Sequence, residues 1–241
     1  IISETQYTAE ELDSYINYAL ALREQAGAQY ANATKISKLI GLGTTLKQME
    51  EQYGLNAMMI LSLAFHESDH GMSEHAQKYN NLFGLYVYDT NPLNKEFESV
   101  EVNISEYIDL FIWKNYVPHN GAYANGSVFG SKALGMNVKY ASDPYWGAKA
   151  AGHYYRADQY LGFKDAKNPY TVGLTTTSGL NVRTVPTTVG NSPLYRYTRK
   201  NLPVIISNTN LPDWYEIIGE QPELPAAYIN KQYINIIETT K

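Results

Sequence analysis

Residues 57–71 read AMMILSLAFHESDHG and join the most apolar run of the chain to its most chemically suggestive side chains. Asn56 stands before the run in the position of a helix N-cap, and Gly71 stands where a helix would end. A helix that is apolar on every side is expected to be buried. The sequence therefore predicts a buried helix that ends close to Glu67.

Glu67 continues the apolar stripe of this predicted helix. The stripe has the spacing i, i+3, i+4 and i+7, at Ile60, Leu63, Ala64 and Glu67. Burial disfavours the charged form of a carboxyl group and raises its pKa, which is what a general acid needs near neutral pH. The position favours a general acid, and the alternative is a structural carboxylate that pairs with an arginine or caps a loop.

The same segment spells His66-Glu67-x-x-His70, a pattern found in zinc peptidases. Two histidines four residues apart on one helix face can bind zinc, with the glutamate as the base. That geometry requires the helix to continue through His70, whereas Gly71 predicts a stop. A third histidine with the extended spacing is absent, and a remote glutamate ligand stays open. We expect no metal and no cofactor.

Composition excludes several classes of protein. The chain has 241 residues, a net charge of -5 and no cysteine. The lack of cysteine excludes disulfide scaffolds, thiolate metal sites and a cysteine nucleophile. Lysines and arginines are scattered, so no nucleic-acid partner is expected, and no apolar run approaches the roughly 20 residues that span a bilayer. The chain begins at Ile1 without Met or signal peptide, as expected of a processed or trimmed piece.

Local patterns divide the chain into a helical part and a β-rich part. Helix periodicity dominates up to Gly162, with capping boxes at Thr8–Glu11 and Asn103–Glu106 and a helix stop at Gly54. Two short strands are predicted at 85–88 and 97–102 around a turn at 89–92. Beyond a predicted linker at 162–169, short β-rich runs at 180–183, 203–206, 214–218 and 227–229 alternate with Pro, Gly and Asn. We expect an α+β chain with a mainly helical domain at 1–165 and a small all-β barrel at 166–241.

Three segments appear in an order that is typical of one enzyme family. Glu67-Ser68 is followed by Gly71-Met72-Ser73, then by Asn-Asn-Leu-Phe-Gly at 80–84 and Tyr-Ala-Ser-Asp-Pro-Tyr-Trp at 140–146. Together they resemble the N-acetylglucosaminidases of glycoside hydrolase family 73, over about residues 50–165. The chain departs from that family at His66 and His70, where small, apolar or aromatic residues are more familiar.

The resemblance implies a lysozyme-like helical core with a small β-lobe at residues 85–102. It implies hydrolysis of the β-1,4 bond after N-acetylglucosamine in peptidoglycan, with Glu67 protonating the leaving oxygen. It also implies that Tyr140 holds an acetamido group or a water. A muramidase or lytic transglycosylase of the same fold is the alternative, although the Gly-Leu-x-Gln run usual in those enzymes is absent.

The second catalytic group stays open at this point. Glu96, Glu98 and Glu101 lie on the predicted lobe, and the family spacing favours Glu101 or Glu98. The acetamido group of the substrate is an alternative to an enzyme base. Asp143 is a further candidate, whose alternative role is a plain helix N-cap before Pro144.

Aromatic and amide side chains are expected to line the glycan groove. The chain has 22 tyrosines, and a tyrosine ring can pack on a sugar while its hydroxyl forms hydrogen bonds. The expected substrate-binding residues are Asn80, Asn81, Phe83, Tyr86, Tyr88, Tyr123 and Tyr145.

The C-terminal part resembles bacterial SH3-like domains over about residues 170–241. The residues that carry this are Gly-Leu-Asn-Val-Arg-Thr-Val-Pro at 179–186, Trp-Tyr-Glu-Ile at 214–217 and Ala-Tyr-Ile at 227–229, with Val185 replacing the usual Gly. The resemblance implies that this domain binds the stem peptide or bridge of peptidoglycan, and a purely structural role is the alternative.

The hypothesis is therefore a secreted, monomeric cell-wall hydrolase of Gram-positive type that acts on glycan strands. A zinc peptidase and a non-catalytic wall-binding module with a degenerate enzyme fold are its rivals.

Overall fold

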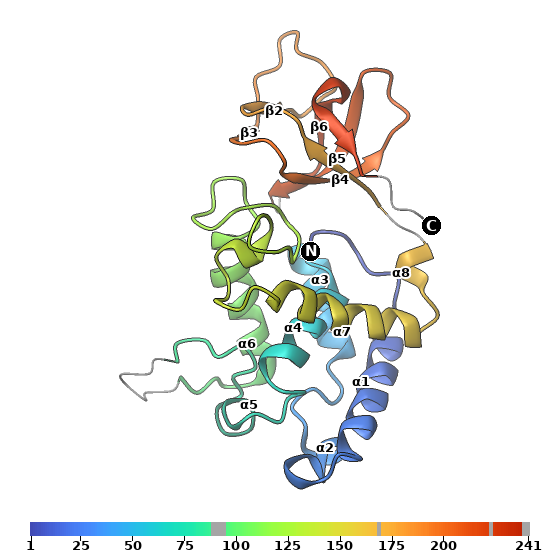
Figure 1. Ribbon diagram of the computed structural model, residues 1–241, viewed down its shortest axis with the longest axis vertical. Coiled ribbons are helices and arrows are strands. Elements are labelled where there is room, and N and C mark those ends of the chain that lie inside the picture. Colours follow the sequence, from blue (N-terminus) through green and yellow to red (C-terminus); the bar gives the residue numbers. More distant parts are fainter. Residues whose placement is uncertain (88–94, 168–169, 222–223, 238–241) are drawn as a thin grey trace. The chain divides into compact units, whose positions relative to one another are not determined.

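The computed structural model of the protein describes residues 1–87, 95–167, 170–221 and 224–237 (Figure 1). It contains two compact units, which we name and describe separately. The helical unit comprises residues 4–111 and 149–167, and the β unit comprises residues 1–3, 112–148 and 168–241. The predicted division into domains 1–165 and 166–241 stays a prediction.

The helical unit carries most of the helices of the chain. In chain order the α-helices are α1 (Ala9–Glu24), α2 (Ala33–Ile36), α3 (Gly43–Tyr53), α4 (Ala57–Glu67), α5 (Glu74–Tyr79), α6 (Val100–Glu106), α7 (Trp146–Tyr160) and α8 (Lys164–Lys167). Short turns of other helix types lie at η1 (Ala28–Tyr30), η2 (Tyr107–Trp113), η3 (Met136–Val138) and η4 (Lys231–Tyr233). No helix among the described residues is both long and apolar enough to cross a bilayer.

The predicted helix ends are confirmed where local chemistry determines them. At the start of α1, Thr8 accepts a hydrogen bond from the Glu11 backbone N–H at 3.3 Å, and the Glu11 carboxylate accepts from the Thr8 N–H at 3.0 Å. At the end of α3, Gly54 takes the left-handed conformation with φ 64°. These contacts satisfy terminal backbone groups that a helix cannot satisfy itself.

Helix α4 is the buried centre of the helical unit, as predicted. Asn56 caps it by accepting from the Met59 N–H at 2.9 Å, and every residue from 57 to 65 is buried. The Phe65 ring lies 5.8 Å from the ring of Tyr15 on α1 and 5.9 Å from the ring of His153 on α7. Helix α4 is therefore held between α1 and α7, which leaves its last residue as the end of a rigid element.

The predicted strand at 97–102 is wrong, because a helix begins inside it. Ser99 caps α6 by accepting from the Val102 N–H at 3.3 Å, and Val100 and Ile104 are buried one helical turn apart. The N-cap and this i, i+4 burial outweigh the β-propensity of the valines. Residues 85–87 form no strand either, and the rest of that predicted hairpin, 88–92, lies outside the described residues. The helical unit thus shows no β-lobe in its described part.

The predicted linker at 162–169 contains a further helix, α8. Its start is capped by Asp158 of α7, whose carboxylate accepts from the backbone N–H groups of Asp165 at 3.1 Å and Ala166 at 3.2 Å. Tyr7 also donates its hydroxyl proton to Asp158. The sequence near residue 165 shows no cap of its own, because the capping side chain comes from the preceding helix.

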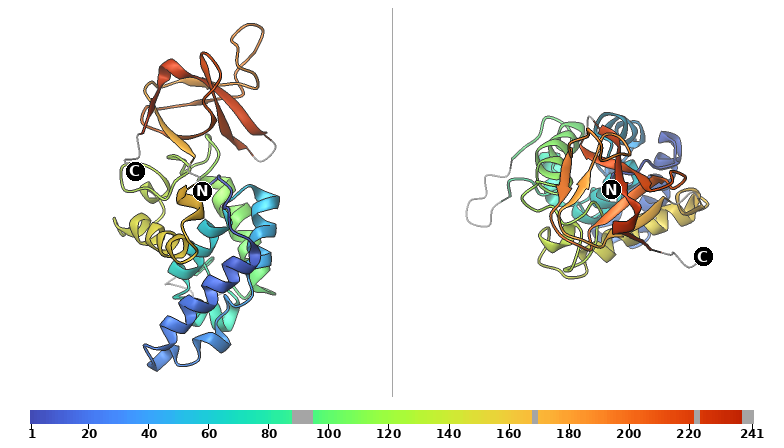
Figure 2. Two further views of the ribbon diagram at one scale, coloured as in Figure 1. Left: turned by 90° about the vertical axis from the view of Figure 1, so that its right-hand side faces the viewer. Right: turned by 90° about the horizontal axis from the view of Figure 1, so that it is seen from above.

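The β unit is built on a five-stranded antiparallel sheet with strand order β6-β5-β4-β1-β7 and a two-stranded sheet of β2 and β3. The strands are β1 (Thr171–Thr175), β2 (Leu180–Val182), β3 (Tyr195–Tyr197), β4 (Pro203–Asn208), β5 (Trp214–Gln221), β6 (Leu224–Asn230) and β7 (Ile234–Ile236). Figure 2 shows that the larger sheet is curled rather than flat. That this arrangement is an SH3-like barrel stays a prediction.

Four of these strands, β2, β4, β5 and β6, were predicted from short β-rich runs, and three were not. Strand β1 contains Gly173, a residue type that is uncommon inside strands. In the sheet a Cβ at this position would lie 2.5 Å from the Ile234 side chain, so the close approach of the neighbouring strand requires glycine.

Candidate active site

Glu67 is the last residue of α4 and is half-buried. The chain turns sharply after it. The Ser68 hydroxyl donates to the Ala64 carbonyl at 2.5 Å and accepts from the Gly71 N–H at 2.7 Å, while Asp69 and His70 have φ of 49° and 62°. Left-handed conformations are costly for residues with a Cβ. The turn thus fixes the end of the helix directly after the predicted acid.

This turn removes the geometry that the zinc-peptidase alternative requires. Because α4 ends at Glu67, His66 and His70 do not share a helix face. In the described part of the chain, no group of three or more His, Cys, Asp and Glu side chains is arranged to hold a metal ion. The shared helix face that a zinc peptidase requires of His66 and His70 is therefore missing here.

A polar network holds the turn from the side of α1. Arg23 donates to the Asp69 carboxylate at 2.8 Å, Tyr30 donates to it at 2.5 Å, and Arg23 also donates to the Tyr30 hydroxyl at 2.9 Å. Burial opposes the charged form of Asp69, but the hydrogen bonds from Tyr30 and Arg23 outweigh it and hold the pKa of Asp69 below its usual range. Sequence reasoning missed Arg23 and Tyr30, which are distant in the chain and match no motif.

The Asn-Asn-Leu-Phe-Gly segment at 80–84 forms a loop that is stabilised by hydrogen bonds of its asparagine side chains. Asn81 is 1% exposed; its side chain donates to the Leu85 carbonyl at 2.9 Å and accepts from the Leu85 N–H at 3.0 Å. Asn103, which the sequence indicates as a helix N-cap, lies instead inside α6, where it accepts from the Leu82 N–H at 2.8 Å. The structure thus assigns Asn81 a loop-holding role, and its contact with a substrate stays a prediction.

We expect Asn81→Ala to lower the free energy of unfolding by about 2–4 kcal/mol, because it leaves the buried N–H and C=O of Leu85 without partners. Urea denaturation followed by circular dichroism measures the change. Asn32→Ala is the control, since Asn32 is exposed and makes no capping bond, and it should change stability by less than about 0.5 kcal/mol. Equal effects of the two substitutions would contradict the loop-holding role.

The other predicted groove residues of the helical unit lie around this loop. Asn80 accepts from Lys38 at 2.9 Å and donates to the Phe97 carbonyl at 3.0 Å. Phe83 is buried and stacks on Tyr107 at 3.8 Å between ring centroids. Tyr86 is exposed and donates to Glu106 at 2.8 Å. Tyr88 lies outside the described residues. Among Asn80, Phe83 and Tyr86, only Tyr86 is exposed to solvent.

The carboxylate candidates Glu98 and Glu101 are both exposed. Glu101 lies in the first turn of α6 rather than on the predicted strand. Asp143 of the β unit accepts from the Tyr145 N–H at 2.8 Å, in the turn just before α7. A catalytic role for any of the three stays a prediction.

Tyr140 belongs to an aromatic cluster in the β unit. Its ring stacks on buried Trp146 at 4.1 Å and lies 5.5 Å from the ring of Tyr116, which in turn lies 5.5 Å from Tyr123. Burial raises the pKa of Tyr116 to about 12. Tyr145 is 69% exposed and Tyr123 is 42% exposed. The structure therefore brings Tyr140 and Tyr123 together through Tyr116, an arrangement that sequence spacing did not indicate.

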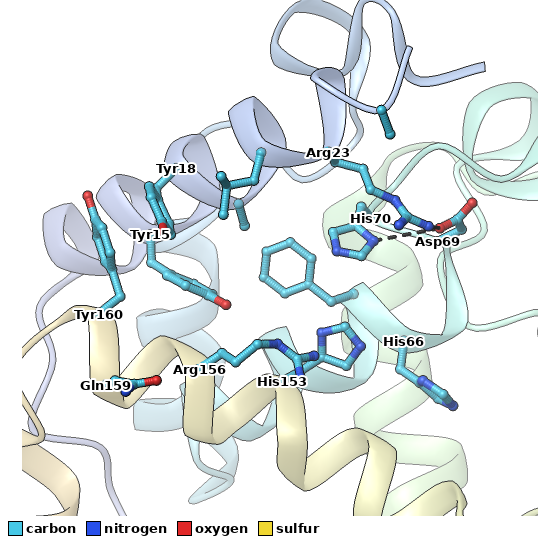
Figure 3. A pocket seen from close by; sticks show the side chains of 14 residues that line it. Tyr15, Tyr18, Arg23, His66, Asp69, His70, His153, Arg156, Gln159 and Tyr160 are labelled. Carbon is cyan, nitrogen blue, oxygen red and sulfur yellow. Dashed lines mark hydrogen bonds and ion pairs between the residues drawn. The ribbon is translucent and has the colours of Figure 1, made fainter. Parts of the chain in front are cut away.

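The helical unit also contains a cavity of about 750 Å³ that the sequence did not predict (Figure 3). We call it the α1–α7 cavity. Its principal lining residues come from α1, from the end of α4 and the turn after it, and from α7: Tyr15, Tyr18, Arg23, Phe65, His66, Asp69, His70, His153, Arg156, Gln159 and Tyr160. The only sequence signal for it was the unusual pair His66 and His70, since His153 showed no pattern.

Burial favours the neutral form of two histidines of the cavity. Burial, with the nearby charge of Arg23, lowers the pKa of His70. Burial, the charge of Arg156 and the neighbouring histidines lower the pKa of His153 to about 3. Neutral imidazoles offer one donor and one acceptor each, so these side chains can form hydrogen bonds in both senses.

Comparisons with known proteins identify relatives for most of the chain. Residues 43–159 match the model of the family described as Glucosaminidase: Mannosyl-glycoprotein endo-beta-N-acetylglucosaminidase. Two proteins from two strains of Streptococcus pneumoniae, provisionally named endo-beta-N-acetylglucosaminidases, are each 37% identical to this chain over 166 residues. The alignments cover 67% of this chain but 22% and 20% of the relatives, so the chain spans about a fifth of their length.

Solved structures with some likeness belong to S. aureus Autolysin E. They include a catalytic mutant in complex with the disaccharide NAG-NAM and a complex with the muropeptide NAM-L-Ala-D-iGlu. Both align with a TM-score of 0.45 at 16% identity and cover 67% of this chain and 71% of the Autolysin E chain. A likeness at this level supports no further argument about the present chain.

Proposed function

Because residues 43–159 of this chain match the glucosaminidase family model, we propose that the protein is an endo-β-N-acetylglucosaminidase that hydrolyses the β-1,4 bond after N-acetylglucosamine in peptidoglycan. The observation that supports this most directly is the placement of Glu67. It is a half-buried carboxyl group at the end of a fully buried helix, followed at once by a tightly bonded turn. Such a rigid position suits a residue that must donate a proton to a leaving oxygen.

In the proposed mechanism, Glu67 protonates the glycosidic oxygen as the bond to the anomeric carbon breaks. An inverting enzyme would activate a water with a second carboxylate about 6.5–9.5 Å away. We propose Glu101 or Glu98 for that role, since their exposure leaves both accessible to water, and Asp143 as the remaining candidate. Attack by the acetamido oxygen of the substrate is the alternative that needs no enzyme base.

Substrate binding is proposed for the exposed or aromatic residues described above. Tyr140 would hold the acetamido group or the attacking water, and Asn80, Phe83 and Tyr86 would shape the groove in which the glycan lies. Their rings and amides offer the apolar faces and hydrogen-bond partners that a sugar requires. We place this activity outside the cell, in the wall of a Gram-positive bacterium, with the protein acting as a monomer.

Mass spectrometry of digested, purified cell wall tests the proposed reaction. We expect new reducing ends on N-acetylglucosamine. New reducing ends on muramic acid would instead identify a muramidase, and anhydro-muramic products would identify a lytic transglycosylase. Either of these results would overturn the proposed bond specificity while leaving the glycosidase assignment in place.

We also propose that the C-terminal residues 166–241 form an SH3-like domain that binds the stem peptide or bridge of the wall. Two cavities of about 390 and 340 Å³ in the β unit share Thr188, Trp214, Asn230 and Gln232. The second is also lined by Asn181, whose buried Oδ1 has no hydrogen-bond partner in the described part of the chain. A groove with an indole and unpaired polar atoms suits an extended peptide, which carries backbone donors.

Trp214→Ala is expected to weaken binding to purified wall by about tenfold or more, because the indole lines both cavities. Pull-down of the protein with insoluble wall measures the binding, and hydrolysis of a soluble glycan should stay unchanged. Val189→Ala is the control, since Val189 is 84% exposed and lines neither cavity. Unchanged wall binding in Trp214→Ala, with the β unit still folded, would overturn the proposed peptide site.

A further inference from the structure

The α1–α7 cavity is separate from the acid that we assign to catalysis. Glu67 is not among the described residues that line it, although its neighbour His66 is. A volume of about 750 Å³ is within the range of sites that hold small ligands. No step of the proposed reaction uses this cavity, so its ligand has to be inferred from the side chains that line it.

Tyrosine rings form one end of the cavity. Tyr18 on α1 and Tyr160 on α7 stack at 4.0 Å between centroids with planes 18° apart, and buried Tyr15 lies 5.7 Å from Tyr160. Tyr18 and Tyr160 nevertheless keep 40% and 44% of their surface exposed. Figure 3 shows the three rings together, across the cavity from Arg23 and His70. A paired aromatic surface of this kind suits the apolar face of a sugar ring.

The charged side chains of the lining carry a net positive charge. Arg23 and Arg156 contribute two guanidinium groups, and Asp69 contributes one carboxylate. Asp69 is already bonded to Arg23 and Tyr30. Arg156 is exposed, and no carboxylate forms an ion pair with it in the described part of the chain. The cavity therefore has a net positive charge, and its Arg156 guanidinium, which contacts the Tyr15 hydroxyl, has no carboxylate partner among the described residues.

Two buried polar atoms in the lining lack partners. His70 Nδ1 and Arg23 Nε form no hydrogen bond among the described residues, and the nearest carboxylate oxygen of Asp69 is 3.6 Å from His70 Nδ1. Buried polar groups are nearly always satisfied, and leaving one unsatisfied costs about 1–3 kcal/mol. His70 and Arg23 thus keep hydrogen-bonding capacity that the described residues do not use.

From this combination we propose that the α1–α7 cavity is a binding site for an acidic saccharide, a sugar that carries a free carboxylate. The stacked tyrosines hold the sugar ring, Arg156 pairs with the carboxylate, and His70 and Arg23 bond to hydroxyl or carbonyl groups. The choice of an acidic amino sugar of the cell wall as the natural ligand rests on the proposed function. The inference that the cavity binds an acidic saccharide rests only on the side chains that line it.

Titration of the full chain with N-acetylmuramic acid, followed by ¹H–¹⁵N NMR, tests the site. This monosaccharide has no glycosidic bond to hydrolyse, so the wild type can be measured directly. We expect shifts at Tyr18, His153 and Tyr160, and a Kd that rises at least tenfold in Arg156→Gln and in Tyr160→Ala. Arg196→Gln is the control, because Arg196 is exposed on β3 of the β unit.

Further titrations separate this proposal from its rivals. N-acetylglucosamine and the dipeptide L-alanyl-γ-D-glutamate should each bind at least tenfold more weakly. Equal binding of the neutral sugar, equal binding of the dipeptide, or no effect of Arg156→Gln would each overturn the proposal. Glu67→Gln should leave the Kd unchanged; loss of binding in that variant would place the sugar at Glu67 instead. If the protein did not hydrolyse cell wall, each of these binding measurements could still be made and would still test the cavity.

Discussion

Glu67→Gln is expected to lower the release of reducing ends from purified wall by about 10²–10⁴-fold, which is the usual contribution of a general acid. The amide has nearly the shape of the carboxyl group but has no acidic proton to donate to the leaving oxygen. Because Glu67 is half-buried at the end of α4, the substitution should leave the helix and its turn intact. The thermal midpoint should therefore stay close to that of the wild type, and binding to wall should be retained.

Glu51→Gln is the matched control for this experiment, since Glu51 is an exposed glutamate on α3. It should keep full activity. Full activity in Glu67→Gln would exclude Glu67 as the acid, and an inactive wild type that binds wall would support the rival hypothesis of a non-catalytic module. Glu98→Gln and Glu101→Gln extend the series. A loss in one of them would identify the base, whereas activity in both would favour Asp143 or the acetamido group of the substrate.

Glu50→Ala is expected to lower the free energy of unfolding by about 3–5 kcal/mol, the largest effect we expect on stability. Glu50 is 5% exposed, and its Oε1 accepts from the backbone N–H groups of Thr5 at 2.8 Å and Ala57 at 2.9 Å. Its other oxygen pairs with Lys47. One carboxylate thus joins the N-terminal segment, α3 and the start of α4, and alanine leaves two buried donors and a cation without their acceptor.

Urea denaturation monitored by circular dichroism at a helix-sensitive wavelength measures this loss. Glu51→Ala changes the neighbouring exposed glutamate and should alter stability by no more than about 0.5 kcal/mol. Glu50→Gln keeps one neutral acceptor, so its loss should be smaller than that of Glu50→Ala. If Glu50→Ala were as stable as Glu51→Ala, the carboxylate would not be the junction that the structure indicates.

Local chemistry explains which elements were predictable. The ends of α1, α3 and α4 depend on residues within a few positions, namely Thr8 with Glu11, Gly54 and Asn56, so sequence pattern alone indicated them. The helix at 100–106 was mistaken for a strand because its valines favour strands. Its helical state depends on the Ser99 cap and on burial of Val100 and Ile104 against the rest of the helical unit.

The amino-acid sequence by itself determined the buried helix, the position of Glu67 at its end and the β-rich character of the C-terminal part. Each of these follows from side-chain periodicity and capping, which act over one or two turns of chain. The tertiary structure alone decided that Asp158 caps α8, that Arg23 and Tyr30 hold the turn after Glu67, and that Tyr18, Tyr160 and Arg156 meet in one cavity. Those contacts join side chains from different elements, several of them far apart in sequence, and only the packing of α1, α4 and α7 brings them within reach of one another.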